Sequence, residues 1–480
     1  MAPAPPSRAT WRRATAALAV VVALAAPACT ASSTAEPPPS VGRGPDTRPP
    51  SSTADVPGTS ASPRPVDTVP PASSGGAPNA DVADGPDAPA ITTPDPTNDP
   101  NPWLRARLAA SGLPVFEGPG DFYAPPSPLP VAAPGTIIRV QTAPTVRVTN
   151  ADAVRIMYHS QDREGHDVAV TGMVTIPQSA APAGGRPVIS WAHGTTGIGA
   201  PCAPSKETVG PDSLAQHYVD LGYVWAATDY YGLGPPGQRH PYLSGVSEAH
   251  AVIDVVRATR TMTMASITDS WLVYGHSQGG QAALFTGELA ATYAPELRLL
   301  GTVAAAPASF LPAVDHLAEN AGRVYVLLMI LGLPTDYPAL HPEDYLTPKA
   351  LALAPVVDTG CGGDVAITYK QFGPDDVVTQ SPLASEPLRS ILEENDPGRA
   401  RTDVPILLTH GADDLTLPPP TSEAIFNRLC GLGQTIDRVV YPGASHSDIV
   451  LVSSGDVDTW MNARLAGLPA PTSCPAAPSA

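Results

Sequence analysis

The sequence predicts an α/β domain with a mainly parallel sheet, and two observations support this fold class. First, short apolar segments closed by Gly, Asp or Pro alternate with helical stretches, as in sheets whose strands are buried on both faces. Second, 43% of the 480 residues are hydrophobic and only 15% are charged, so the chain can bury a large core. We expect this domain to cover residues 101–480.

The first hundred residues are predicted to lie outside the domain. Three arginines precede an eleven-residue apolar run that ends at Ala26, and small residues follow it. This order is typical of a secretory signal, which we expect over residues 1–28. The run is too short to span a bilayer core of about 30 Å. Residues 31–100 contain seventeen prolines and no leucine or aromatic residue, so we expect a disordered tether over 29–100.

Cys29 gives the end of the signal two interpretations. The sequence APAC at 26–29 fits an AxA site cut after Ala28, which would release a secreted protein. It also resembles a lipobox with alanine where leucine is usual. A single cysteine followed by a Thr/Ser/Pro-rich tether favours lipidation of Cys29, and the two acyl chains of a diacylglycerol would anchor the protein firmly to the envelope.

The folded part begins with a predicted β-hairpin. Two runs of alternating apolar residues, 153–160 and 168–177, flank a turn-forming segment. Five apolar runs follow as strands of the parallel sheet, and helical segments alternate with them. The strands are 186–194, 222–230, 270–277, 299–307 and 404–411, and the helices are 247–262 and 279–294.

One interval breaks this alternation. Roughly ninety residues separate the strand that ends near Ala306 from the strand that begins at Val404. We expect an insertion over about 308–402 that folds as a cap. Its apolar segment Val324–Leu333 has about half the length that a membrane helix needs, which favours a buried helix of the cap over an exposed hydrophobic lip.

Net charge and cysteine content limit the classes of partner. The net charge of −18 argues against nucleic-acid binding and against a polybasic membrane contact. Four cysteines of the exported part form an even set, which predicts two disulfides. Because they form no CxxC pair and lack zinc-finger spacing, the alternative of a metal site is disfavoured. These cysteines are Cys202, Cys361, Cys430 and Cys474.

Ser277 lies between two glycines directly after a predicted strand. The residues Gly275 to Gly279 fit the pattern GxSxG, and a helix follows. A sharp strand-to-helix turn with glycines on both sides exposes the serine hydroxyl at the helix N-terminus. A serine that only capped the helix would not need both glycines. We therefore predict that Ser277 is a nucleophile.

A serine hydroxyl needs a base to remove its proton, and the base needs an acid to orient it. His446 is the single histidine after residue 410, so elimination predicts it as the base, with a surface histidine as the alternative. The acid is expected on the loop after 404–411, which offers Asp413 and Asp414. Asp414 is favoured by its turn pattern, which leaves Asp413 as a solvated or helix-capping neighbour. The pattern is Gly411, Asp414, Leu417 and Pro418.

Backbone donors for an oxyanion are predicted at two places. The Gln278 N–H follows the nucleophile at the helix start, and the loop after 186–194 brings Thr195 or Thr196. His193 is expected to brace that loop through a hydrogen bond. The other histidines show neither metal-ligand spacing nor an HExxH motif. Of these, His276 belongs to the turn, and His240 and His250 are scattered.

Several motifs in order make the chain resemble the secretory lipase family, the lipase A-like α/β-hydrolases, as an exported bacterial member. The resemblance runs from about Phe122 to Cys474. It implies an α/β-hydrolase core with a helical cap inserted before the acid-bearing strand. The motifs are FYAPPSPLPVAAPGTIIR, WAHGTTG, DYYGLG, HPYL, YGHSQGG, HGADD and GASHSD.

The resemblance also implies the roles of individual residues. It gives the triad Ser277, Asp414 and His446, with an oxyanion hole near Thr195 and Gln278. It favours disulfides that pair Cys202 with Cys361 and Cys430 with Cys474.

We predict an exported enzyme that hydrolyses acylglycerols or related acyl esters through an acyl-enzyme. We expect it to be a monomer that needs neither cofactor nor metal. A serine peptidase on the same fold is one alternative, because the same residues can cleave amides. The other alternative is a catalytically inactive binding protein anchored to the envelope.

Overall fold

The structure of the chain is a computed structural model that describes residues 101–117, 120–143, 148–206, 212–309, 322–373 and 376–475. The expected signal peptide, Cys29 and the tether lie outside these residues. In the described part, one nine-stranded sheet has the order β1-β2-β3-β5-β4-β6-β7-β8-β9. Strands β4 to β9 are paired in parallel, whereas β1, β2 and β3 join the edge in antiparallel pairs.

The strand bounds agree with the sequence expectation for the hairpin and for five of the six parallel strands, β4 to β8. The edge strand β1 was not predicted, because its sequence IIRVQT mixes polar and apolar residues and most of it is only half-buried. The strands are β1 (Ile137–Thr142), β2 (Ala151–Gln161), β3 (Asp167–Pro177), β4 (Arg186–Ala192), β5 (Val224–Thr228), β6 (Ile267–His276), β7 (Arg298–Ala305), β8 (Ile406–Gly411) and β9 (Ile436–Tyr441).

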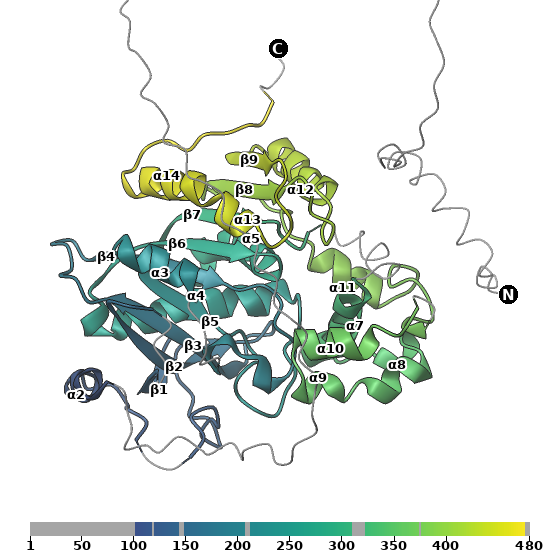
Figure 1. The fold of residues 1–480 in the computed structure, drawn as a ribbon, viewed down its shortest axis with the longest axis horizontal. Helices are drawn as coiled ribbons and strands as arrows, with labels where there is room; N and C mark the ends of the chain where they lie inside the picture. The colour runs from purple at the N-terminus through teal and green to yellow at the C-terminus, as the bar shows by residue number, and fades with distance from the viewer. Residues whose placement is uncertain are drawn as a thin grey trace, which may run out of the picture. The chain divides into compact units, whose positions relative to one another are not determined.

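Helices cover both faces of the sheet, so successive strand residues enter different cores (Figure 1). On β4, Val188 packs with α4 (Gly245–Thr261) and α5 (Gln278–Tyr293). The next residue, Ile189, belongs to the core shared with α3 (Ser213–Asp220) and α14 (Ser454–Leu465). The remaining helices around the sheet are α2 (Pro102–Ala110), α12 (Pro420–Gly431) and α13 (Ile449–Val452).

The segment between β7 and β8 forms a separate group of helices, drawn in green in Figure 1. We call its described residues, 322–373 and 376–402, the cap. Its helices share their own hydrophobic core, to which Tyr242 and Leu417 of the sheet domain also contribute. The cap helices are α7 (Arg323–Gly332), α8 (Pro348–Leu353), α9 (Val356–Thr359), α10 (Gly362–Tyr369) and α11 (Leu388–Glu394).

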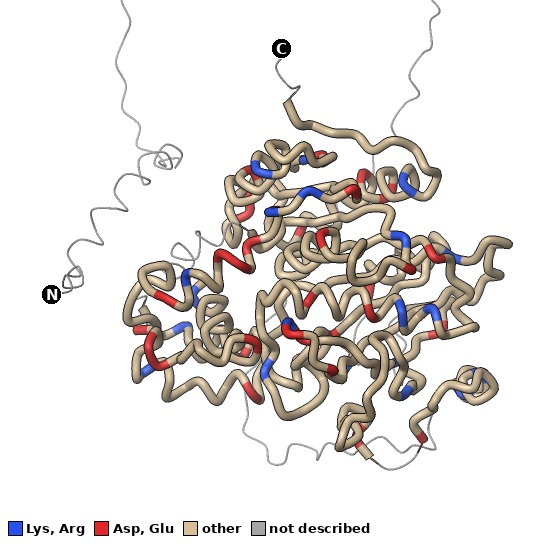
Figure 2. The backbone as a smooth tube through the Cα atoms, turned by 180° about the vertical axis from the view of Figure 1, so that it is seen from behind, with Lys and Arg blue, Asp and Glu red and all other residues tan. Residues whose placement is uncertain are grey.

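Helix α7 contains the apolar segment that the sequence placed in the cap. Its residues from Val326 to Gly332 are buried, which confirms a buried helix rather than an exposed lip. Within the described ranges, no helix combines the length and the apolar character needed to cross a bilayer. Figure 2 shows acidic and basic positions interspersed in the cap as well as around the sheet.

Two disulfides connect distant segments, and they are the pairs that the resemblance favoured. Cys202–Cys361 joins the short helix η2 (Ala200–Cys202) to the residue that precedes α10, with Cα atoms 5.3 Å apart. Cys430–Cys474 joins α12 to the C-terminal segment, with Cα atoms 5.5 Å apart. Because the loops that they close span 159 and 44 residues, chain entropy gives about 4 to 5 kcal/mol for each disulfide.

Candidate active site

Ser277 occupies the sharp turn between β6 and α5. Its backbone has φ 59° and ψ −119°, a conformation that costs a non-glycine residue on the order of 1–3 kcal/mol. Hydrogen bonds on both sides hold the turn, since the Ser277 N–H donates to the Ala305 carbonyl at 2.9 Å. The Ser277 carbonyl in turn accepts the N–H groups of Gly280 and Ala308, each at 2.9 Å. The strain is therefore supported by the surrounding backbone.

The glycines of the GxSxG pattern are required by close backbone contacts. A Cβ atom on Gly275 would lie 1.9 Å from the Gly279 carbonyl oxygen. A Cβ atom on Gly279 would lie 1.8 Å from the Ala192 carbonyl oxygen at the end of β4. The turn can therefore pack this tightly against the sheet only without these side chains.

His446 contacts both Ser277 and Asp414. Its Nε2 atom lies 2.9 Å from Ser277 Oγ, and its Nδ1 atom lies 2.7 Å from Asp414 Oδ2. Asp413 is exposed, whereas the Asp414 side chain is fully buried. Of the two aspartates that the sequence offered, Asp414 is thus the one beside the imidazole.

The Asp414 carboxylate is held by several donors. Its Oδ1 atom accepts the N–H groups of Thr416 at 2.9 Å and Leu417 at 2.8 Å. Burial alone would raise the pKa of Asp414, but hydrogen bonds from His410 and His446 outweigh it and hold this pKa well below its usual range. The carboxylate therefore stays ionised at neutral pH and favours a proton on His446 Nδ1.

His276 holds the backbone of the histidine loop, a contact that the sequence analysis missed. Its Nε2 atom lies 2.8 Å from the His446 carbonyl oxygen, and the two rings lie 4.8 Å apart. Burial and the neighbouring His446 lower the pKa of His276 to about 4, so its ring is neutral and Nε2–H can donate to that carbonyl. GxSxG carries no signal for this contact, because its partner lies 170 residues away.

The loop His193–Thr196 runs beside Ser277. A Cβ atom on Gly194 would lie 3.6 Å from Ser277 Cβ. The next residue, Thr195, has its Oγ1 atom 2.6 Å from the Tyr242 hydroxyl. Thr196 is held instead through its carbonyl oxygen, which accepts the Gly362 N–H at 2.7 Å. Of the two threonines, Thr195 is the one bonded to Tyr242.

His193 braces this loop, as the sequence predicted. Its Nδ1 atom lies 2.6 Å from the Gly194 carbonyl oxygen, and its own carbonyl oxygen accepts the Tyr230 hydroxyl at 3.0 Å. Burial lowers the pKa of His193, so the ring is neutral and can donate a proton to Gly194.

A cavity of about 540 Å³ lies between this loop and the cap. Thr195 and Thr196 line one side of it, and the disulfide Cys202–Cys361 borders it. Its cap side includes Val324, Tyr325 and Leu328 of α7, with Gly362, Gly363 and Ala366 of α10. The cavity can receive an apolar chain beside Thr195.

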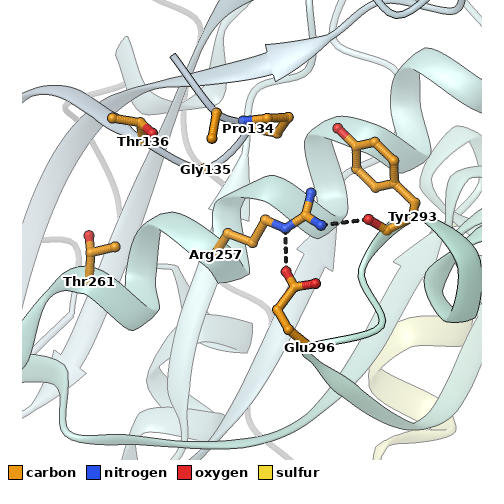
Figure 3. A pocket seen from close by; sticks show the side chains of 8 residues that line it. Pro134, Gly135, Thr136, Arg257, Thr261, Tyr293 and Glu296 are labelled. Atoms are coloured by element: carbon orange, nitrogen blue, oxygen red, sulfur yellow. Dashed lines mark hydrogen bonds and ion pairs between the residues drawn. The ribbon is translucent and has the colours of Figure 1, made fainter.

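A second cavity, of about 460 Å³, lies around Arg257 and contains none of the predicted site residues (Figure 3). The Arg257 guanidinium donates to Glu296 at 2.6 Å, to the Tyr293 carbonyl at 2.5 Å and to Asp254 at 2.8 Å. Because its charge is already paired, this cavity offers no cation to a ligand.

Residues 211–473, which include Ser277, Asp414 and His446, match the secretory lipase family. The chain belongs to this family. Lipase A of Arthroderma benhamiae is 23% identical to this secretory lipase over 400 residues, which cover 76% of this chain and 83% of the relative. The secreted triacylglycerol lipase LIP3 of Malassezia restricta is also 23% identical, over 75% of this chain and 82% of the relative.

The solved structures support the same fold for the secretory lipase. Candida antarctica lipase A superposes with a TM-score of 0.64 at 21% identity, covering 74% of this chain and 87% of that structure. The α/β-hydrolase fold predicted from the sequence is thus confirmed. Family and fold together make the chain a hydrolase of the lipase and esterase class.

Proposed function

We propose that this secretory lipase hydrolyses acyl esters with Ser277 as nucleophile, His446 as general base and Asp414 as the acid that orients it. The observation that carries the proposal is the continuous line of contacts from Asp414 Oδ2 through both ring nitrogens of His446 to Ser277 Oγ, at 2.7 and 2.9 Å. With Nδ1 protonated against the carboxylate, Nε2 is free to accept the serine proton.

The reaction proceeds in two acyl transfers. His446 Nε2 takes the proton of Ser277 as Oγ attacks the ester carbonyl, and the oxyanion that forms is bound by the Gln278 N–H and by donors at Thr195. The imidazolium returns the proton to the leaving alcohol, which leaves an acyl-enzyme on Ser277. A water molecule then gives its proton to His446 and attacks the acyl carbon, and the imidazolium returns this proton to Ser277 Oγ as the acid leaves.

Acylglycerols or related acyl esters are the proposed substrates. The cavity beside Thr195 supports this choice, because apolar side chains of α7, including Val324 and Leu328, line it. A relative that carries the name triacylglycerol lipase adds support. Hydrolysis rates of p-nitrophenyl esters from acetate to oleate will show which acyl length the cavity accepts.

The decisive test replaces Ser277 with alanine. If the three residues act as a unit, kcat on p-nitrophenyl esters should fall by about a millionfold. A fluorophosphonate probe should label the wild-type protein and leave Ser277→Ala unlabelled. Substantial ester hydrolysis by Ser277→Ala would refute the assignment. A wild-type protein without labelling would indicate the inactive binding protein, and faster cleavage of aminoacyl anilides than of esters would indicate a peptidase.

We place the enzyme outside the cytoplasm, attached to the envelope through a lipid on Cys29. Two disulfides support an oxidising compartment, and a relative is named as secreted. Metabolic labelling with an alkyne fatty acid should mark the protein, and Cys29→Ser should lose the mark. An unlabelled soluble enzyme would show a secreted protein without an anchor.

A further inference from the structure

The segment 240–243, with the sequence HPYL, contacts both sides of the proposed oxyanion hole. On one side, His240 Nε2 lies 2.7 Å from the side-chain nitrogen of Gln278. On the other side, the Tyr242 hydroxyl lies 2.6 Å from Thr195 Oγ1. Two residues that follow different strands of the sheet, Thr195 after β4 and Gln278 after β6, thus contact one short stretch of chain.

The Gln278 side chain is fixed within a fully buried cluster. His240 and Glu248 are both 0% exposed, and Gln278 is 1% exposed. His240 Nδ1 lies 2.7 Å from the Tyr231 carbonyl oxygen and donates its proton there, so Nε2 accepts from the Gln278 amide. The second amide proton goes to Glu248 Oε1 at 2.7 Å. The first residue of α5 therefore cannot rotate without breaking buried hydrogen bonds.

The Glu248 carboxylate and the Tyr230 ring hold His240 and the 240–243 segment in place. Glu248 Oε1 also accepts the Leu243 N–H at 3.0 Å, which links α4 to the segment. The Tyr230 ring stacks on His240 with centroids 5.4 Å apart and planes 11° apart. The imidazole thus has one position and one tautomer.

Tyr242 fixes the threonine side of the hole. It is only 3% exposed, and its hydroxyl meets Thr195 Oγ1 within hydrogen-bond distance. This bond restrains the Thr195 side chain and, with it, the backbone N–H that the proposed function assigns to the oxyanion. Oxyanion donors are effective only when they are held at 2.7–3.1 Å from the developing charge, so the position of Thr195 matters to the reaction.

We propose that His240 and Tyr242 are positioning residues for the hydrolysis, which hold Gln278 and Thr195 at the separation that an oxyanion requires. This inference rests on the proposed function of Ser277. A displacement of about 1 Å in such a site can cost about 10²-fold in rate. Neither residue needs to touch the substrate.

The cap packs directly on the same segment. A Cβ atom on Gly332, the last residue of α7, would lie 2.5 Å from the His240 carbonyl oxygen and 3.1 Å from the Tyr242 nitrogen. The Thr335 hydroxyl donates to the Arg239 carbonyl at 2.9 Å. A change in the cap at Gly332 therefore displaces residues that hold the oxyanion donors.

The central test is a double-mutant cycle of Tyr242→Phe and Thr195→Val. Tyr242→Phe should lower kcat about 10- to 100-fold and leave KM within about twofold. Its affinity for a trifluoromethyl ketone, whose serine adduct carries the oxyanion, should fall by the same factor as kcat/KM. If Tyr242 acts through Thr195, the double variant should be no slower than Thr195→Val alone.

Tyr223→Phe is the matched control for Tyr242→Phe. It also removes a buried tyrosine hydroxyl, but that hydroxyl donates to Asn462 at 3.0 Å. It should keep wild-type kcat and ketone affinity. A Tyr242→Phe variant with wild-type values of both, or multiplicative losses in the double variant, would overturn the inference.

A second variant covers the case in which Tyr242→Phe fails to fold. His240→Phe keeps a ring against Tyr230 but removes both nitrogen contacts, and it should also lower kcat at constant KM. Wild-type kcat in this variant would contradict the role of His240. If Ser277→Ala retains activity, the proposed function itself fails. If Ser277→Ala is inactive and the positioning variants are fully active, only the present inference fails.

The cap contact can be tested with Gly332→Ala. The added methyl group should displace the His240 carbonyl. The variant should show a larger fold-change in kcat, which should fall, than in KM. Gly455→Ala is the control, because a Cβ atom there meets nothing within 4 Å. Equal kcat for the two variants would contradict the coupling of the cap to the 240–243 segment.

Discussion

Replacing Asp414 with asparagine tests the geometry of the site most directly. The Asp414 Oδ1 atom accepts two backbone N–H groups, from Thr416 and Leu417. An amide oxygen can keep both bonds, which turns the amide nitrogen toward His446 Nδ1. Two N–H donors cannot face each other, so the imidazole must carry its proton on Nε2 and can no longer accept one from Ser277.

The size of the effect follows from this change of tautomer. A base in the wrong tautomer lowers kcat by about 10⁴, which corresponds to about 5.4 kcal/mol in the activation barrier. The assay is kcat/KM for a p-nitrophenyl ester, with thermal unfolding to verify the fold. The exposed neighbour provides the control, and Asp413→Asn should keep most of the activity. If Asp414→Asn retained more than about a tenth of the wild-type kcat/KM, the orienting role would be refuted.

Three further predictions concern stability. Because the pKa of His276 falls from 6.5 to about 4 on folding, the wild type should lose about 3 kcal/mol of unfolding free energy as pH drops from 6.5 to 4, and urea unfolding should show a smaller loss in His276→Gln. Parallel pH curves for both proteins would contradict this origin. Gly279→Ala should prevent formation of the turn, since its Cβ atom would lie 1.8 Å from a carbonyl oxygen. As a control, Gly431→Ala should fold normally, because a Cβ atom there meets nothing within 4 Å. Circular dichroism and fluorophosphonate labelling would distinguish the two variants. Replacing Cys202 and Cys361 together with serine should lower the unfolding free energy by about 5 kcal/mol, and an unchanged denaturation midpoint would count against the entropic account.

The parts of the fold that local sequence controls could be predicted. Strands of a parallel sheet are apolar throughout, so runs such as 404–411 were recognisable without a partner. The turn at Ser277 was recognisable because both glycines that its packing requires lie within two residues of the serine. His446 could be found by elimination, since the chain offers no other histidine after residue 410.

The contacts that position these residues could not be predicted. His276 contacts His446 although the two are 170 residues apart in the sequence. Thr195 and Tyr242, which contact each other, are 47 residues apart. Such contacts depend on how the loops pack after the sheet has formed, and no periodicity or spacing in the sequence encodes them. For the same reason the residues themselves left Thr195 and Thr196 as alternatives, and only the family resemblance favoured Thr195; in the structure Thr195 is the one whose Oγ1 atom contacts the Tyr242 hydroxyl.

The Cys202–Cys361 disulfide also determines how the enzyme should be produced. It covalently joins the segment just after the Thr195 loop to the cap helix α10, so a chain made in a reducing cytosol would lack that link. Kinetic constants measured on such material would describe an enzyme whose cap and Thr195 loop are held together by non-covalent contacts alone. Periplasmic expression or oxidative refolding, followed by a thiol assay, is therefore the appropriate starting point for comparing variants.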